Sequence, residues 1–223
     1  MNKSTFLCLL APLFVFQAAF AQQPFSDAEI TYAVKVDLPS GASAQLAAAF
    51  EDSRLVYSFK NYLFRSDMNV GKTTYTKIHN SRNNSAITLI DAGPNKYLIR
   101  MSAADLAKES ARFDGLQYTN EPGEKQIAGY SCKKALGKLS DGSSFTVYYS
   151  PELIPEFKDF SPRFKGLDGF PLAFEMTTSH HLKMTMTATS VSIAPQPTAK
   201  FQTPTSGYRA MSYTELENLR NRK

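Results

Sequence analysis

The chain has no tryptophan, only three histidines and only two cysteines among its 223 residues. Cys8 lies in an apolar N-terminal run, so cleavage of that run as an export signal leaves Cys132 as the single cysteine. An internal disulfide is then excluded, although the oxidising compartments outside the cytoplasm permit one. The folded part must therefore be held together by its hydrophobic core.

Sequence motifs of common hydrolases and metalloenzymes are also missing. There is no G-x-S-x-G turn for an activated serine, and no H-E-x-x-H or paired-cysteine motif for zinc. His180 and His181 are neighbours and would project to opposite faces of a strand, while His79 is distant in sequence. Glu175 and Asp168 are isolated carboxylates, and a sequence does not show whether such groups converge. We expect no catalytic residues, no metal ligands and no cofactor.

Long apolar runs are absent except at the N-terminus. Lys3 precedes an apolar stretch over residues 6–20, and Ala19-Phe20-Ala21 is a small-x-small cleavage site. The run is about 15 residues long, shorter than the roughly 20 that a membrane-spanning helix needs. We expect residues 1–21 to be a signal peptide and the mature chain to begin near Gln22. The product is then exported without a transmembrane segment, to the periplasm, to the outer membrane or into the medium.

The charge of the chain is only mildly basic. The formal net charge is +5, with 25 basic and 20 acidic residues, and loss of Lys3 leaves 24 basic residues and a net charge of +4. The basic residues are scattered apart from a cluster at residues 220–223, which we interpret as the end of a helix. We expect no nucleic-acid partner.

Alternation of apolar and polar residues dominates between Ala28 and Ile193, which is typical of strands with one buried face. In residues 54–60, for example, Leu55, Tyr57 and Phe59 fall on one face. Turn signals such as Gly93-Pro94-Asn95 separate the strands and favour hairpins. The pattern predicts a mainly β protein with a few short helices, built on a curved antiparallel sheet or incomplete β-barrel. We expect a single β-rich domain over residues 22–210, followed by a C-terminal helix over residues 211–223.

Three short helices and one long loop complete the expected structure. The helices are predicted over residues 43–52, 102–109 and 212–222, the last opening with the capping box Ser212-x-x-Glu215. Residues 150–166 combine three prolines with three phenylalanines, which is too interrupted for a helix and too apolar for a solvated linker. We expect this segment to fold over one opening of the sheet.

Aromatic and methionine side chains on strand faces are the candidate ligand-binding residues. A single curved sheet with few helices has little material to cover a wide apolar face, and methionines adapt to varied ligand shapes. The same side chains equally suit an ordinary core. The candidate set is Tyr57, Phe59, Phe64, Tyr97, Phe170, Phe174, Met184 and Met186.

Several short motifs resemble a known family of exported proteins. They are Ile127-Ala-Gly-Tyr-Ser-Cys-Lys-Lys134, then Val147-Tyr-Tyr149 with Gly169-Phe-Pro-Leu172, and finally residues 201–208, which end in Gly-Tyr. In this order they resemble the GLPGLI-type and related exported domains of unknown function from Bacteroides-like bacteria, although Gly169-Phe-Pro-Leu172 departs from the literal string. The resemblance implies an architecture similar to the LolA/LolB lipoprotein carriers, an incomplete antiparallel barrel with a helical lid, and it implies no catalytic residues.

Three functions are compatible with these features. The leading hypothesis is a non-enzymatic binding or carrier protein of the periplasm or envelope, with an apolar groove for a lipid or acyl group. The alternative is a structural or protein-interaction module of the cell envelope in which the sheet face is fully packed, and its partner is then an envelope protein. An enzyme of unknown type is the second alternative.

Overall fold

The computed structural model describes residues 22–177 and 182–221. The predicted signal peptide and both His180 and His181 therefore lie outside the described residues. Strands take up 53% and helices 18% of the described residues, which confirms the prediction of a mainly β protein with few short helices. No helix in the described part of the chain is long and apolar enough to cross a membrane.

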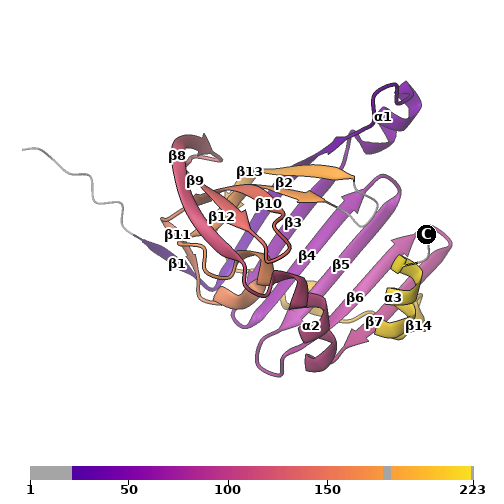
Figure 1. Cartoon of the computed structure of the whole chain (residues 1–223). Coiled ribbons are helices and arrows are strands. Elements are labelled where there is room, and N and C mark those ends of the chain that lie inside the picture. The colour runs from indigo at the N-terminus through magenta and orange to yellow at the C-terminus, as the bar shows by residue number, and fades with distance from the viewer. Residues whose placement is uncertain (1–21, 178–181, 222–223) are drawn as a thin grey trace, which may run out of the picture.

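Twelve strands of the described chain form one large sheet, in the order β14-β7-β6-β5-β4-β3-β2-β13-β12-β10-β9-β8 (Figure 1). Their bounds are β2 Asp27–Asp37, β3 Arg54–Lys60, β4 Leu63–Val70, β5 Thr73–Asn80, β6 Ser85–Ala92, β7 Asn95–Met101, β8 Gln117–Ile127, β9 Tyr130–Lys138, β10 Ser144–Ser150, β12 Phe170–Thr177, β13 Lys183–Ser192 and β14 Arg209–Met211. Two further strands, β1 (Gln23–Phe25) and β11 (Leu153–Pro155), pair in parallel.

Short turns join most neighbouring strands, and these pairs are antiparallel as predicted. Gly71 between β4 and β5 and Gly93 between β6 and β7 both have a positive φ, which glycine adopts without steric cost. β14 differs from the prediction because it pairs with β7 in parallel. The chain reaches β14 by a long crossing from β13, and not by a hairpin, so antiparallel entry is not imposed.

The sheet is open and unevenly curved. Its two edge strands are β8 and β14, and no ladder joins them. At the β8 end the sheet is rolled, so that β8 curls back towards β13, while β3–β7 form a flatter fan (Figure 1). Phe59, Phe64 and His79 are cross-strand neighbours on β3, β4 and β5, and they define the face that we call the concave face.

A proline-rich strap, residues 193–208, crosses the opposite, convex face from β13 to β14. It contains the short 3-10 helix η4 (Thr198–Phe201). Lys60 Nζ donates to the carbonyl of Gln196 at 2.7 Å, and Lys200 pairs with Glu29 on β2. Because the strap spans the strands between β13 and β7, it fixes the position of the C-terminal segment on the far edge.

The described chain has three α-helices outside the sheet, and two of them lie over the concave face. α2 (Ala103–Ser110) packs against β6 and β7, and α3 (Tyr213–Asn221) packs against β7 (Figure 1). The predicted capping box of α3 is present, because Ser212 Oγ accepts from Glu215 N at 3.2 Å and the Glu215 carboxylate accepts from Ser212 N at 2.8 Å. α1 (Ala44–Phe50) projects from the β2–β3 hairpin and buries no residue.

Candidate functional site

The concave face carries a continuous cluster of aromatic rings. Seven of the eight predicted ligand-binding residues lie in it and are at least nine-tenths buried: Tyr57, Phe59, Phe64, Phe170, Phe174, Met184 and Met186. The sequence pattern therefore brings these seven side chains together. Phe59, Phe170, Met184 and Met186 lie deepest, with at most 1% of their surface exposed.

Tyr97 is separate from the other predicted residues. It lies on β7 and packs with Ile99, Met101, Tyr213 and Leu216 in a second, smaller core beneath α3. Tyr97 is on the same face as the cluster, but it lies far from the rolled end and belongs to the docking site of the C-terminal helix.

A cavity of about 630 Å³ lies on the concave face between α2, β3–β5 and residues 157–165. We call it the helix-side cavity. Tyr57 and Phe64 lie on its floor side, Leu106 of α2 lines one wall, and His79 and Phe157 line another. Its volume falls within the roughly 300–1,000 Å³ typical of small-molecule sites.

A second cavity of about 210 Å³ adjoins the first one. Its apolar wall is formed by Leu55, Met68, Phe174, Met176 and Met186, so we call it the methionine cavity. Tyr75, Thr76 and Thr88 also line it. The two cavities share four lining residues, namely Tyr57, Ser66, Lys77 and Glu109. Together they form one concave groove with a polar end under α2 and an apolar end against β12 and β13.

The junction between the two cavities is marked by an ion pair. Lys77 on β5 pairs with Glu109 in the last turn of α2, and both side chains are about 30% exposed. Ser102 and Asp105 cap the N-terminus of α2, which contributes no fully buried residue. The helix is therefore held over the concave face by half-buried Leu106 and by this ion pair, and not by a deep apolar contact.

Residues 157–166 form a lid segment over the rolled end of the sheet. It contains the 3-10 helices η2 (Lys158–Phe160) and η3 (Pro162–Phe164). Phe160 and Phe164, the last residues of these two helices, are buried. The Phe160 ring lies 5.2 Å from Phe59 and Phe64, measured between centroids. The sequence expectation of a proline-phenylalanine loop folded over one opening agrees with this arrangement.

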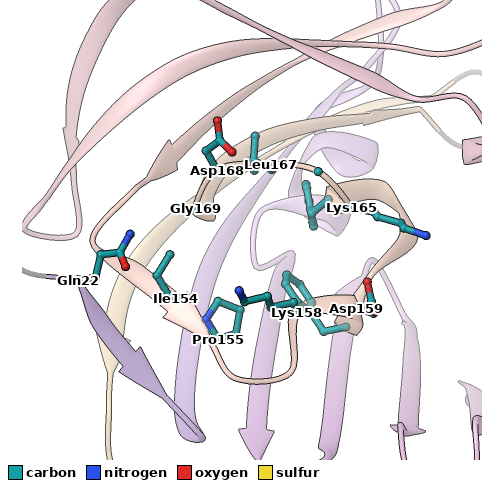
Figure 2. A pocket seen from close by; sticks show the side chains of 12 residues that line it. Gln22, Ile154, Pro155, Lys158, Asp159, Lys165, Leu167, Asp168 and Gly169 are labelled. Atoms are coloured by element: carbon teal, nitrogen blue, oxygen red, sulfur yellow. The ribbon is translucent and has the colours of Figure 1, made fainter.

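On its outer side the lid segment lines a further pocket of about 450 Å³ (Figure 2). Figure 2 shows Lys158, Asp159, Lys165 and Asp168 around this opening, with Gln22 at its edge. Phe160 lines both this outer pocket and the helix-side cavity. Asp159 and Lys165 also line both, so this part of the lid segment lies between the outer pocket and the concave groove.

Arg163 anchors the lid segment to the sheet. Its guanidinium carbon lies 4.8 Å from the centroid of Phe145 on β10 and 5.1 Å from that of Phe113, and an N–H donates to the carbonyl of Glu175 at 3.3 Å. Burial, together with nearby Arg112, lowers its pKa to about 10, so the guanidinium stays charged at neutral pH. The cation–π contacts offset part of the desolvation of this charge.

The residues considered for catalysis do not converge in the structure. Glu175 pairs with Lys183 at 2.8 Å; burial favours its neutral form, but hydrogen bonds from Lys183 and Thr146 outweigh burial and lower its pKa. Asp168 lines the outer pocket instead. Cys132 is buried, and burial raises its pKa to about 12. Among the described residues there is no group of three histidine, cysteine or acidic side chains that suits a metal ion.

Sequence reasoning missed the polar side of the groove. Lys77, His79 and Ser66 share the concave face only because of the β4–β5 register, in which Phe64 pairs with His79 and Ser66 with Lys77. The position of Glu109 depends on how α2 folds back from β7. Residues 73–80 carry only two apolar side chains, Tyr75 and Ile78, three positions apart, so no alternation marks this strand in the sequence.

The fold and its groove define a class of architecture, an open curled sheet whose concave face is covered by short helices and a lid segment. No protein-family model matches the chain, and no curated protein is similar to it in sequence. PNGF-II in its P21 crystal form is similar in structure with a TM-score of 0.50 and 14% identity, over 87% of this chain and 33% of that one. The chain therefore spans about a third of PNGF-II, and at this identity the likeness shows the fold alone.

Two other solved structures match with lower scores. MucB matches with a TM-score of 0.39 and 10% identity, over 81% of this chain and 58% of MucB. MucB of Pseudomonas aeruginosa is also known in a complex with MucA. A LolA superfamily protein, NE2245 from Nitrosomonas europaea, matches with a TM-score of 0.24 and 12% identity, over 82% of this chain and 92% of that one.

Proposed function

We propose that this protein is an exported, non-enzymatic binding protein of the periplasm or envelope that shelters the apolar chain of a lipid or other amphiphile in the concave groove. The observation that carries the proposal is the junction of the two cavities through Tyr57, Ser66, Lys77 and Glu109. Because one end is apolar and the other polar, the groove matches a molecule with one apolar chain and one polar head.

The apolar end is suited to an acyl chain. Met68, Met176 and Met186 line it together with Leu55 and Phe174. Thioether side chains are flexible and polarisable, so they adjust to chains of different length and saturation. The predicted residues Tyr57, Phe64, Phe174 and Met186 supply groove walls in this proposal, while Phe59, Phe170 and Met184 support them from behind.

The groove is reached most easily by moving α2. This helix is held by an ion pair and half-buried contacts, and a partly exposed ion pair contributes only about 0–1 kcal/mol. Displacement of α2 therefore costs little compared with unfolding of the sheet. In the proposed cycle the helix lifts, the chain of the ligand enters between β3–β5 and the helix, and the helix then closes over it.

A groove-filling variant tests the proposal. Ser66 lines both cavities, so Ser66→Phe places a ring where they join, whereas Ser144→Phe adds the same ring at an exposed position on β10. We expect monodecanoylglycerol or another decyl amphiphile to bind the wild type and Ser144→Phe, and to bind Ser66→Phe at least tenfold more weakly with unchanged circular dichroism. Equal binding by all three proteins, or by none, contradicts the proposal.

The filled rolled end favours a second candidate function. Phe160 packs against Phe59, Phe64 and Phe170, so this part of the interior has no room for a ligand. Such packing suits a protein-interaction module of the envelope, with function on the edges of the sheet. Capture of one defined envelope protein by the wild type, retained by Ser66→Phe, supports this alternative.

A further inference from the structure

His79 places in the groove a buried ring nitrogen, Nε2, that no protein group satisfies among the described residues. It lies on β5, lines the helix-side cavity and packs against Phe157, with ring centroids 5.2 Å apart at an interplanar angle of 55°. Its Nε2 is shielded from solvent and has no hydrogen-bond partner among the described residues. A buried polar atom without a partner is uncommon in folded proteins and calls for an explanation.

The charge state of the imidazole decides what Nε2 offers to a ligand. Burial lowers the pKa of His79, and Lys77 on the same strand lowers it further. A hydrogen bond with Asn84 and the carboxylates of Glu109 on α2 and Asp159 in the lid segment act in the opposite direction but do not outweigh burial. The ring is therefore neutral at pH 7.

The interaction with Asn84 favours one tautomer of His79. This bond favours the protonated form of His79, which means that a ring N–H donates to the Asn84 side chain. Because Nε2 is without a partner, the donating nitrogen is Nδ1. The neutral ring then carries its only proton on Nδ1, and Nε2 presents a lone pair, so it accepts and does not donate.

The other charges of the helix-side cavity disfavour an acid. Two lysines, Lys77 and Lys165, line it against three carboxylates, those of Glu109, Asp114 and Asp159. One of the two ammonium groups is already paired, since Lys77 binds Glu109. An anionic head group would therefore enter a cavity whose formal charge is 2 − 3 = −1 from these side chains.

From these contacts we infer that His79 is the head-group contact of the groove, and that the amphiphile it takes carries a hydrogen-bond donor, a hydroxyl or an amine, and not a carboxylate, sulfate or phosphate. This inference rests on the proposed function, because it assigns the head of the ligand whose chain lies in the methionine cavity. The shared chemistry of the two head groups is the N–H or O–H that Nε2 accepts.

Four probes with ten-carbon chains separate the possibilities: monodecanoylglycerol, decylamine, decanoate and decyl sulfate. At about pH 8, well above the ordinary histidine pKa of about 6.5, we expect the glycerol ester and the amine to bind about tenfold more tightly than the two acids. Comparison of the ester with the amine shows whether the natural head is neutral or cationic. Lowering the pH to a second value, below the depressed pKa of His79, protonates Nε2, which then donates, and the preference over decyl sulfate shrinks or reverses.

Two substitutions of the same residue assign the effect to His79. His79→Leu removes the acceptor, and we expect binding of the glycerol ester to weaken about tenfold at about pH 8 while decyl sulfate is unaffected. His79→Gln keeps a hydrogen-bonding group near the position of Nε2 but does not titrate, so its head-group preference should not change between the two pH values. The Gln variant also controls for protonation of the nearby carboxylates.

The outcomes keep this inference distinct from the proposed function. If none of the four probes binds, the proposed function fails and the inference fails with it. If all four bind, the acids bind as tightly as the donors at about pH 8, and His79→Leu changes nothing, the groove stands but the assignment of its head group is wrong. Retention of the pH-dependent preference in His79→Gln also overturns the assignment.

Discussion

The ring of Phe160 stacks on the ring of Phe170, with centroids 5.4 Å apart and planes inclined by 27°. Phe160 belongs to the lid segment and Phe170 begins β12, so this contact joins the lid to the sheet. Only 6% of Phe160 is exposed. The lid is therefore part of the core at the rolled end, and its removal would join the outer pocket to the groove.

Phe160→Ala is expected to destabilise the protein by about 3–5 kcal/mol, because a buried ring in a cluster of rings leaves a cavity. Urea unfolding followed by circular dichroism measures the loss. The cavity should also raise the capacity of the groove for decyl probes. Phe157→Ala is the matched control, since Phe157 is only half-buried and should cost less. Equal losses of stability in the two variants contradict the role of Phe160 as a core residue that joins the lid segment to the sheet.

Gly169 precedes β12 at a point of close backbone approach. A Cβ built there would lie 2.2 Å from the carbonyl oxygen of Ser150. Because a backbone carbonyl cannot swing away as a side chain does, we expect Gly169→Ala to cost about 3 kcal/mol or more. The control is Gly93→Ala, whose Cβ meets nothing within 4 Å and whose positive φ costs about 1–2 kcal/mol. A smaller loss for Gly169→Ala than for Gly93→Ala, by urea unfolding, would be the contrary result.

Stability should fall in alkali because buried hydroxyl and thiol groups resist ionisation. Burial raises the pKa of Cys132 to about 12, and burial also raises the pKa values of Tyr32 and Tyr57 above their ordinary range. In the unfolded chain these groups lose their protons first, at about pH 8.5 for cysteine and about pH 10 for tyrosine. Their contribution to stability is therefore complete below these values and is lost as the pH rises towards the folded-state values.

The measurement for this pH dependence is the urea midpoint between about pH 8 and pH 11. Cys132→Ala should flatten the first part of the fall, because it removes the group that ionises first in the unfolded chain. A midpoint that does not move over this range contradicts the burial of these groups.

The strands with one buried face were predictable because each carries its own signal. β3 begins and ends where the alternation of Leu55, Tyr57 and Phe59 predicts. β8 has no such signal, since it is an edge strand exposed on both faces and contains Pro122 and Gly123 at an irregularity of its pairing. Without a buried face, a strand leaves no alternation in the sequence.

The candidate site was predictable on its apolar side only. Burial requires apolar side chains at alternate positions, so Tyr57, Phe64, Phe174 and Met186 were identified from the sequence. How deeply these side chains are buried was not predictable, because Phe160, which packs on Tyr57, belongs to a loop distant in sequence. The polar residues Lys77 and His79 meet α2 and the lid segment through tertiary packing, and no spacing in the sequence encodes that meeting. The GLPGLI-type resemblance stays a prediction, since no family model matches.

Methyl NMR of the methionines tests the central claim most directly. Met68, Met176 and Met186 line the apolar end of the groove, whereas Met101 and Met211 lie in the separate core beneath α3 and serve as internal references. On titration with monodecanoylglycerol, the account predicts saturable shifts of the first three methyl signals that are larger than those of Met101 and Met211, which sense the ligand only through Leu106 of α2. Shifts centred on Met101 and Met211, or no shift at any methionine, would contradict it.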